Sequence, residues 1–175
     1  MNNEEPPHKE AAGWAFALIL VLLYALIFWP KPGQAAESPN VGTTWLVIPV
    51  TSWHEVDKKY NENNWGLGIE YQFNSNWSII GGGYENSIDA TTLYVGGVYS
   101  PSFLQYNLQQ IHIKSGVMLG VFSGYADKNI LISAPTLQIE IDKKVGIDFL
   151  LGCTNFRCKE GVIGLSFKFT KGVLE

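Results

Sequence analysis

The sequence predicts an all-β fold: an eight-stranded antiparallel up-and-down transmembrane β-barrel, preceded by an apolar segment. Three observations lead to this prediction. From Thr43 onward, apolar and polar residues alternate with a period of two, and no helical period is evident. Only 16% of the residues are charged, against about 25% in an average soluble protein. The chain also holds 18 glycines and 13% aromatic residues. With a net charge of −4 and no basic cluster, this composition excludes a disordered chain, a coiled coil and a nucleic-acid-binding protein.

The first 36 residues are expected to form a separate segment. Gly13 to Trp29 carries no charge and is at the short limit for a membrane-spanning helix. Small residues at Gly33 and Ala35 fit a signal-peptidase site, which indicates an export signal. The acidic start MNNEEPPHKE indicates instead an uncleaved membrane anchor. Both interpretations divide the chain into a signal peptide or anchor at 1–36 and a barrel at 37–175.

Eight short segments with alternating polarity are the expected strands. Turn residues separate several of them, at 74–76, 100–102 and 142–144. Segments of this length joined by short turns are typical of an eight-stranded barrel. In chain order the expected strands are residues 43–53, 67–73, 76–84, 91–100, 111–125, 137–141, 145–149 and 163–169.

Alternation alone does not say which face of each strand points into the barrel. A soluble lipocalin-like carrier would bury the apolar face, whereas a membrane barrel would bury the polar face. Glycines lie on the polar faces, where a narrow barrel has little interior space, and this favours the membrane barrel. Aromatic residues near the strand ends also favour it, because such residues form interfacial girdles. These residues are Tyr71, Phe73, Trp77, Tyr99, Tyr125, Phe167 and Phe169.

Two motifs carry a resemblance to a known family. The stretch IPVTSWH ends at His54, and the stretch YNENNWGLG begins at Tyr60. Together they resemble the outer-membrane lipid A palmitoyltransferase family, which has an Ile-Pro pair, a Trp-His pair and a Tyr-Asn-Glu…Trp-Gly segment in this order. Ser87 falls where that family has a serine, and Pro135 falls where a proline opens its sixth strand.

The resemblance implies an outer-membrane acyltransferase that moves a palmitoyl-type chain from a phospholipid to lipid A and modifies lipopolysaccharide. His54 would act as general base, and Ser87 would belong to the same site. Pro49 and Pro135 would interrupt the strand ladder and form lateral gates for the donor lipid. His54, Ser87 and Cys153 lie in connections whose parity places them on the outer side of such a barrel.

Asn86 stands where the family has an acidic residue. An amide keeps the hydrogen-bonding shape of the acid but cannot hold a charge beside an imidazolium. The acidic role could pass to Glu85 or Asp89, or the protein could be a non-catalytic barrel of the same architecture. If the resemblance holds, Asn86→Asp is expected to keep or raise activity.

Cys153 and Cys158 are expected to form a disulfide across a hairpin, since both would lie in an oxidising compartment. No ligand residues accompany them at metal-binding spacing, so neither a metal nor a cofactor is expected. The expected partners are membrane lipids, with a phospholipid as donor and lipid A as acceptor. No nucleic acid is expected, and the barrel is expected to be a monomer. If the apolar segment is not cleaved, the protein would be anchored in the inner membrane.

Overall fold

The computed structural model describes residues 42–55, 60–125, 128–153 and 161–170, all within the unit Ala35–Glu175. The predicted signal or anchor segment lies outside the described residues. The described part of the chain contains no helix that is long and apolar enough to cross a membrane. Its strands are β1 (Thr43–His54), β2 (Gly66–Gln72), β3 (Trp77–Glu85), β4 (Thr91–Tyr99), β5 (Gln105–Leu108), β6 (Ile111–Tyr125), β7 (Lys128–Ile141), β8 (Val145–Cys153) and β9 (Gly161–Thr170).

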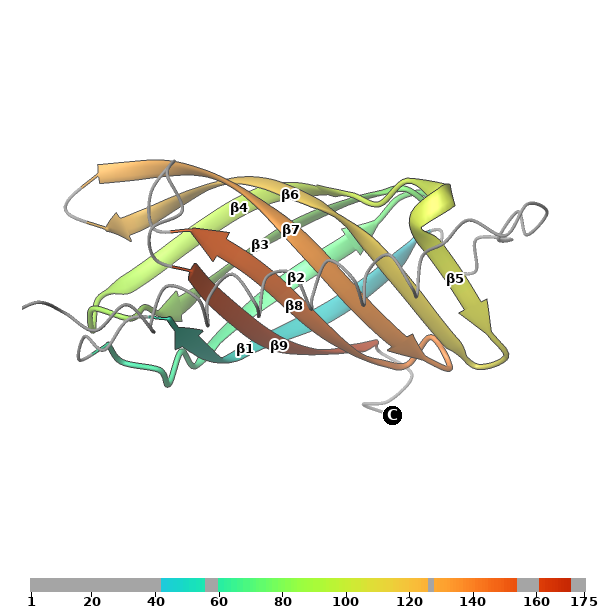
Figure 1. Ribbon diagram of the computed structural model, residues 1–175, viewed down its shortest axis with the longest axis horizontal. Coiled ribbons are helices and arrows are strands. Elements are labelled where there is room, and N and C mark those ends of the chain that lie inside the picture. The colour runs from blue at the N-terminus through green and yellow to red at the C-terminus, as the bar shows by residue number, and fades with distance from the viewer. Residues whose placement is uncertain (1–41, 56–59, 126–127, 154–160, 171–175) are drawn as a thin grey trace, which may run out of the picture. The chain divides into compact units, whose positions relative to one another are not determined.

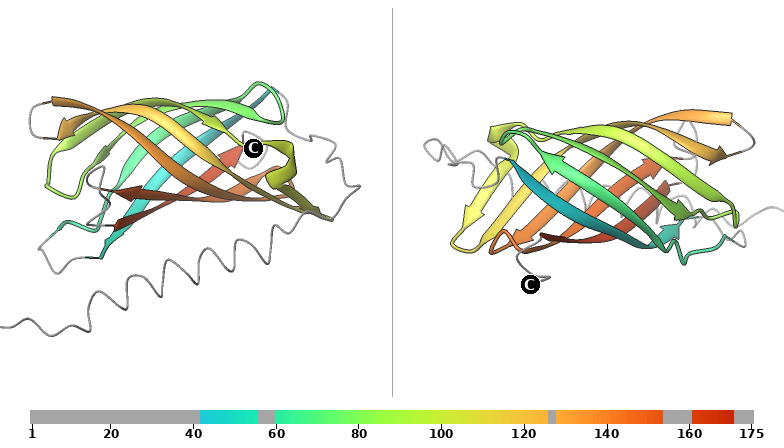
Figure 2. Two further views of the ribbon diagram at one scale, coloured as in Figure 1. Left: turned by 45° about the horizontal axis from the view of Figure 1, so that its top comes forward. Right: turned by 180° about the vertical axis from the view of Figure 1, so that it is seen from behind.

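Eight of these strands close into a barrel (Figures 1 and 2). Each strand pairs antiparallel with its neighbours in the order β4-β3-β2-β1-β9-β8-β7-β6, and β4 pairs with β6 to close the circle. Closure satisfies backbone hydrogen bonds around the wall and removes the free edges of the sheet. The predicted eight-stranded antiparallel up-and-down barrel is therefore confirmed.

Two features depart from the expected strands. The short strand β5 follows a 3₁₀ turn at Ser102–Leu104 and pairs with the first residues of β6, so it continues the line of β4. Strand β7 begins at Lys128, because its first half pairs with the second half of β6. The expectation that Pro135 opens this strand is therefore wrong, since Pro135 lies within it opposite Val117.

The polarity of the barrel is inverted relative to a soluble protein. On β2, the outward Leu67 and Ile69 are 58% and 57% exposed, whereas the inward Glu70 is only 1% exposed. The same alternation places Glu140 and Lys168 fully inside, at 0% exposed. An apolar outer wall around a polar interior is the arrangement of a membrane-spanning barrel, because lipid contacts the outside. The soluble lipocalin-like alternative requires the opposite polarity and is excluded.

Inward-facing glycines make room for larger side chains in the narrow interior. A Cβ atom at Gly68 would lie 2.5 Å from the Tyr94 hydroxyl, and one at Gly146 would lie 2.8 Å from Lys168 Cε. The glycines on the polar faces therefore give interior space, as the sequence predicts.

Exposed aromatic side chains gather near both ends of the strands. One end of the barrel holds the first residue of β1 and the last residue of β9. At this end the Trp77 and Tyr99 rings lie 4.5 Å apart. At the opposite end, Trp53 and Trp65 are exposed. Tyr125 departs from the expected girdle, because its hydroxyl lies 3.1 Å from that of the lumen-facing Tyr84. The other exposed members of the predicted set are Tyr71, Phe73 and Phe167.

Candidate active site

An irregularity in β1 directs its last residues into the barrel mouth. Trp45 and Val47, at odd positions, are fully buried and face inward. The register with β9 shifts between Pro49 and Thr51, so the even-numbered Ser52 turns inward instead. A bulge adds one residue to a strand and re-aims the side chains beyond it. Without this extra residue, Ser52 and His54 would face the lipid.

His54 and Ser87 form the core of the candidate site. The His54 Nε2 atom lies 2.8 Å from the Ser87 Oγ atom, which is hydrogen-bonding distance. The Ser87 hydroxyl is buried, and the Tyr60 ring stacks on the imidazole with 4.2 Å between ring centroids. A serine hydroxyl on an imidazole nitrogen is the arrangement of a nucleophile and its general base. The structure thus brings together two residues that are 33 positions apart in the chain.

Ser52 is the third polar side chain at this point. Its Oγ atom lies 3.3 Å from His54 Nε2 and 3.4 Å from Ser87 Oγ. Sequence reasoning missed this residue, because regular alternation from Trp45 places position 52 on the outer face. The only sequence signal is Pro49, since proline is often found where a strand is irregular.

Asn86 lies beside Ser87, but its amide group is engaged in the loop. Its Nδ2 atom donates to Thr92 Oγ1 and to the Gly124 carbonyl oxygen, both at 3.0 Å. Its Oδ1 atom accepts from the backbone N–H groups of Ile88 and Ala90, also at 3.0 Å. This is the bonding of a turn-forming asparagine. The amide therefore holds the Ser87 loop, and its oxygen, which would have to accept a hydrogen bond from the imidazole, already accepts two from the backbone.

The two alternative acidic residues of this loop lie on its outer surface. Glu85 and Asp89 are both exposed, and Asp89 adopts a φ of 59° at the tip of the turn. A short polar residue is common at such a left-handed position.

Below the site the barrel interior is first apolar. Tyr94, Val98, Met118 and Phe122 form a buried cluster, and further apolar side chains pack against it. Along β6 from the mouth, the inward side chains read Phe122, Met118, Lys114 and His112, so the interior changes from apolar to charged. The interior beneath the site is therefore apolar.

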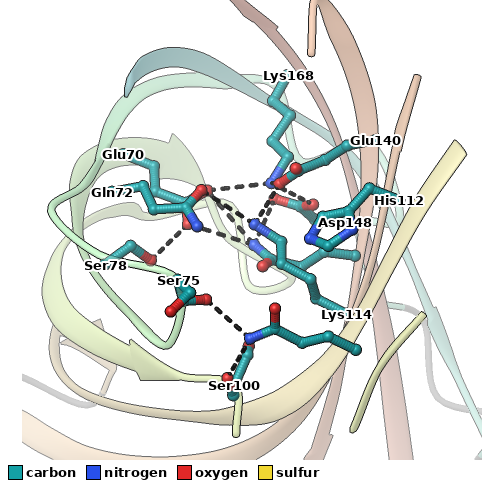
Figure 3. A network of polar contacts seen from close by, with 12 residues as sticks. Glu70, Gln72, Ser75, Ser78, Ser100, His112, Lys114, Glu140, Asp148 and Lys168 are labelled. Atoms are coloured by element: carbon teal, nitrogen blue, oxygen red, sulfur yellow. Dashed lines mark hydrogen bonds and ion pairs between the residues drawn. The ribbon is translucent and has the colours of Figure 1, made fainter. Parts of the chain in front are cut away.

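An ionic network fills the opposite half of the barrel (Figure 3). Lys168 Nζ lies 2.8 Å from Glu140, 3.2 Å from Asp148 and 3.4 Å from Glu70. Lys114 forms an ion pair with Glu140 and donates to Gln72 Oε1 at 3.1 Å. Ser78 and Gln138 also donate to Glu70, at 2.5 and 3.3 Å. This network crosslinks six strands around the interior, namely β2, β3, β6, β7, β8 and β9.

Two proline residues lie where the strand ladder is interrupted. Strand β1 pairs with β2 only as far as Val47, and contact resumes at a single bridge from Thr51 to Asn63. Pro49 lies in this interval. Strands β7 and β8 pair only as far as Thr136 and Leu150, and Figure 1 shows them separating beyond that point.

Pro135 is the first residue past the last β7–β8 pair, and from there β7 pairs only with β6 among the described residues. A proline cannot donate a ladder hydrogen bond. Both prolines singled out from the sequence therefore mark breaks in the wall.

Of the two cysteines expected to form a disulfide, the structure describes Cys153. Cys153 is the last residue of β8, at the end that carries His54 and Ser87. Cys158 lies outside the described residues, so the Cys153–Cys158 disulfide stays a prediction.

No family model and no curated protein matches this chain. It is similar to a solved structure from the de novo design of transmembrane β-barrels, at 12% identity and a TM-score of 0.49, covering 76% of this chain and 98% of that one. It is also similar to Ail, the attachment invasion locus protein of Yersinia pestis, at 20% identity and a TM-score of 0.39, covering 74% of this chain and 99% of that one.

Proposed function

We propose that this chain is an outer-membrane acyltransferase that takes an acyl chain from a phospholipid and transfers it to a lipid hydroxyl. The observation that carries the proposal is the 2.8 Å contact between His54 Nε2 and Ser87 Oγ at the mouth of a membrane-spanning barrel. A nucleophile and a base in contact at the mouth of a membrane barrel suit acyl transfer between lipids.

The reaction follows from the two groups. The Ser87 oxygen attacks the carbonyl carbon of the phospholipid ester while His54 takes its proton. When the ester bond breaks, His54 returns that proton to the departing glycerol oxygen, and the acyl chain stays on Ser87. An acceptor hydroxyl then attacks the acyl-serine and loses its proton to His54. The bond between the acyl group and the Ser87 oxygen breaks, and His54 returns the proton to that oxygen, which restores the free serine. General-base assistance of this kind is typically worth about 10² to 10⁴ in rate.

Two further features support a lipid donor. The interior next to the site holds the packed side chains of Tyr94, Met118 and Phe122, which suit contact with an acyl chain better than with a polar substrate. The breaks beside Pro49 and Pro135 are points where a chain could pass from the membrane through the wall without breaking ladder hydrogen bonds. Lipid A as acceptor and palmitoyl as acyl group come from the resemblance of the IPVTSWH motif and are part of the proposal.

One observation favours a second candidate function. Asn86, in the position of the family's acid, uses its amide for the loop and cannot orient the imidazole. A barrel with this substitution and without catalysis would serve as a structural protein of the envelope.

Mass analysis of lipid A separates the two functions. Cells producing the wild type should contain lipid A that is heavier by one acyl chain, and cells producing His54→Ala or Ser87→Ala should lack it. A heat-dependent shift in gel mobility of each variant shows that the barrel is folded. The Ser115→Ala variant is the control, because it removes a buried hydroxyl on β6 that has no partner among the described residues. Unmodified lipid A in the wild type, or full modification in His54→Ala, would contradict acyl transfer to lipid A at this site.

A further inference from the structure

Ser52 completes a triangle of polar atoms at the barrel mouth. The Ser52 Oγ atom is 3.3 Å from His54 Nε2 and 3.4 Å from Ser87 Oγ, while His54 and Ser87 are 2.8 Å apart. Ser52 is only 7% exposed, so water has little access to its hydroxyl. It is held at this place by the β1 bulge and by its backbone N–H, which donates to the Glu62 carbonyl oxygen at 3.0 Å.

The bonding capacity of the three groups decides how the protons are arranged. A neutral imidazole nitrogen without hydrogen has a single lone pair, so Nε2 accepts one strong hydrogen bond. The shorter contact assigns that bond to Ser87. The Ser52 hydroxyl can then direct its hydrogen to Ser87 Oγ, which still has lone pairs. With the imidazole hydrogen on Nδ1, Ser52 would donate to Ser87, and Ser87 would donate to His54.

We propose that Ser52 is a positioning residue that donates a hydrogen bond to the Ser87 oxygen. This inference rests on the proposed function. As the Ser87 proton passes to His54, negative charge grows on the Ser87 oxygen, and a donor at that atom stabilises it. The hydrogen bond from Ser52 also holds Ser87 in the rotamer whose hydroxyl hydrogen points to His54 Nε2. Ser52 itself forms no covalent bond in the reaction.

The test measures lysophospholipid release by the purified full chain in mixed micelles of phosphatidylcholine and detergent. We expect Ser52→Ala to lower kcat about 10- to 100-fold with little change in KM, because one donor is lost from a group that carries charge only during the reaction. Ser52→Thr keeps the hydroxyl and should restore kcat to within about threefold of the wild type. Ser115→Ala is the matched control and should retain the wild-type rate.

A second readout reports on Ser87 alone. A fluorophosphonate reagent should label Ser87 more slowly in Ser52→Ala than in the wild type, and Ser52→Thr should restore the labelling rate. A purely structural role would change heat-modifiable mobility and would not be repaired by the hydroxyl. If Ser52→Ala does not fold, Ser52→Cys takes its place, since a thiol is a weak donor of similar size.

The outcomes separate this inference from the proposed function. If Ser87→Ala is inactive while Ser52→Ala keeps full kcat and labelling, the role of Ser52 is wrong and the acyltransferase stands. If the acyl group or the fluorophosphonate is found on Ser52, the assignment of nucleophile and donor is overturned. If Ser87→Ala is as active as the wild type, the proposed function itself fails.

Discussion

Replacing Lys168 by methionine should strongly destabilise the barrel. Its ammonium group contacts three carboxylates at 2.8, 3.2 and 3.4 Å, and neither Lys168 nor Glu140 has any exposed surface. Methionine would leave those carboxylates with only one nearby lysine, Lys114. Removing one partner of a buried ion pair costs about 3–5 kcal/mol, because a buried charge loses its compensation. That loss corresponds to a factor of about 10² to 4 × 10³ in the unfolding equilibrium.

Urea titration of the barrel folded into lipid vesicles gives the free energy of unfolding. The matched control is Lys144→Met, which removes an exposed lysine from the turn between β7 and β8 and should change that free energy by less than about 0.5 kcal/mol. Combining Lys168→Met with Glu140→Gln should cost less than the sum of the two single changes, because one uncompensated charge is then absent. A loss below about 1 kcal/mol in Lys168→Met would refute the view that the ionic network stabilises the barrel.

Three further predictions concern the mouth and the wall. Contrary to the expectation from the family resemblance, Asn86→Asp should lower activity and cost about 1–3 kcal/mol of stability, since a carboxylate oxygen would face the Gly124 carbonyl. Mass analysis of lipid A and urea titration measure the two effects, and a gain of activity would contradict the role of Asn86 in the loop. In a variant without native cysteines, Ile88→Cys should react with an impermeant maleimide added to intact cells, and Lys143→Cys should not. The reverse pattern would contradict the predicted orientation of the barrel in the membrane. A disulfide between Pro135→Cys and Leu151→Cys should lower lipid acylation at least about tenfold, and a reductant that opens the disulfide should restore it. If the oxidised and reduced forms are equally active, the break between β7 and β8 is not the lipid route.

Much of the fold could be predicted because a period of two determines both strand and face. On β2, the pattern from Leu67 to Gln72 alone separates lipid-facing from inward residues, and the structure confirms it. Strand β5 could not be predicted, since its four residues are too few to show a period. The start of β7 at Lys128 could not be predicted, because among the described residues the first half of this strand pairs with β6 and not with β8.

The candidate site could be predicted only in part. Regular alternation is broken by the bulge after Pro49, so no pattern could place Ser52 inside the barrel. The Asn86 bonds depend on the Gly124 carbonyl, 38 positions away, and no local pattern reports that contact. Closure of the barrel determines which distant residues meet, and a local sequence pattern gives no information on those contacts.

The most direct test of the account is the release of lysophospholipid from phosphatidylcholine by the purified barrel, measured for the wild type and for His54→Ala. This assay needs no particular lipid acceptor, because water can take the acyl group from Ser87 and restore the free serine for the next turnover. The account predicts steady release by the wild type and a rate about 10² to 10⁴ lower in a folded His54→Ala variant. Equal rates in the two proteins, or no release by the folded wild type, would contradict acyl transfer by the His54–Ser87 pair.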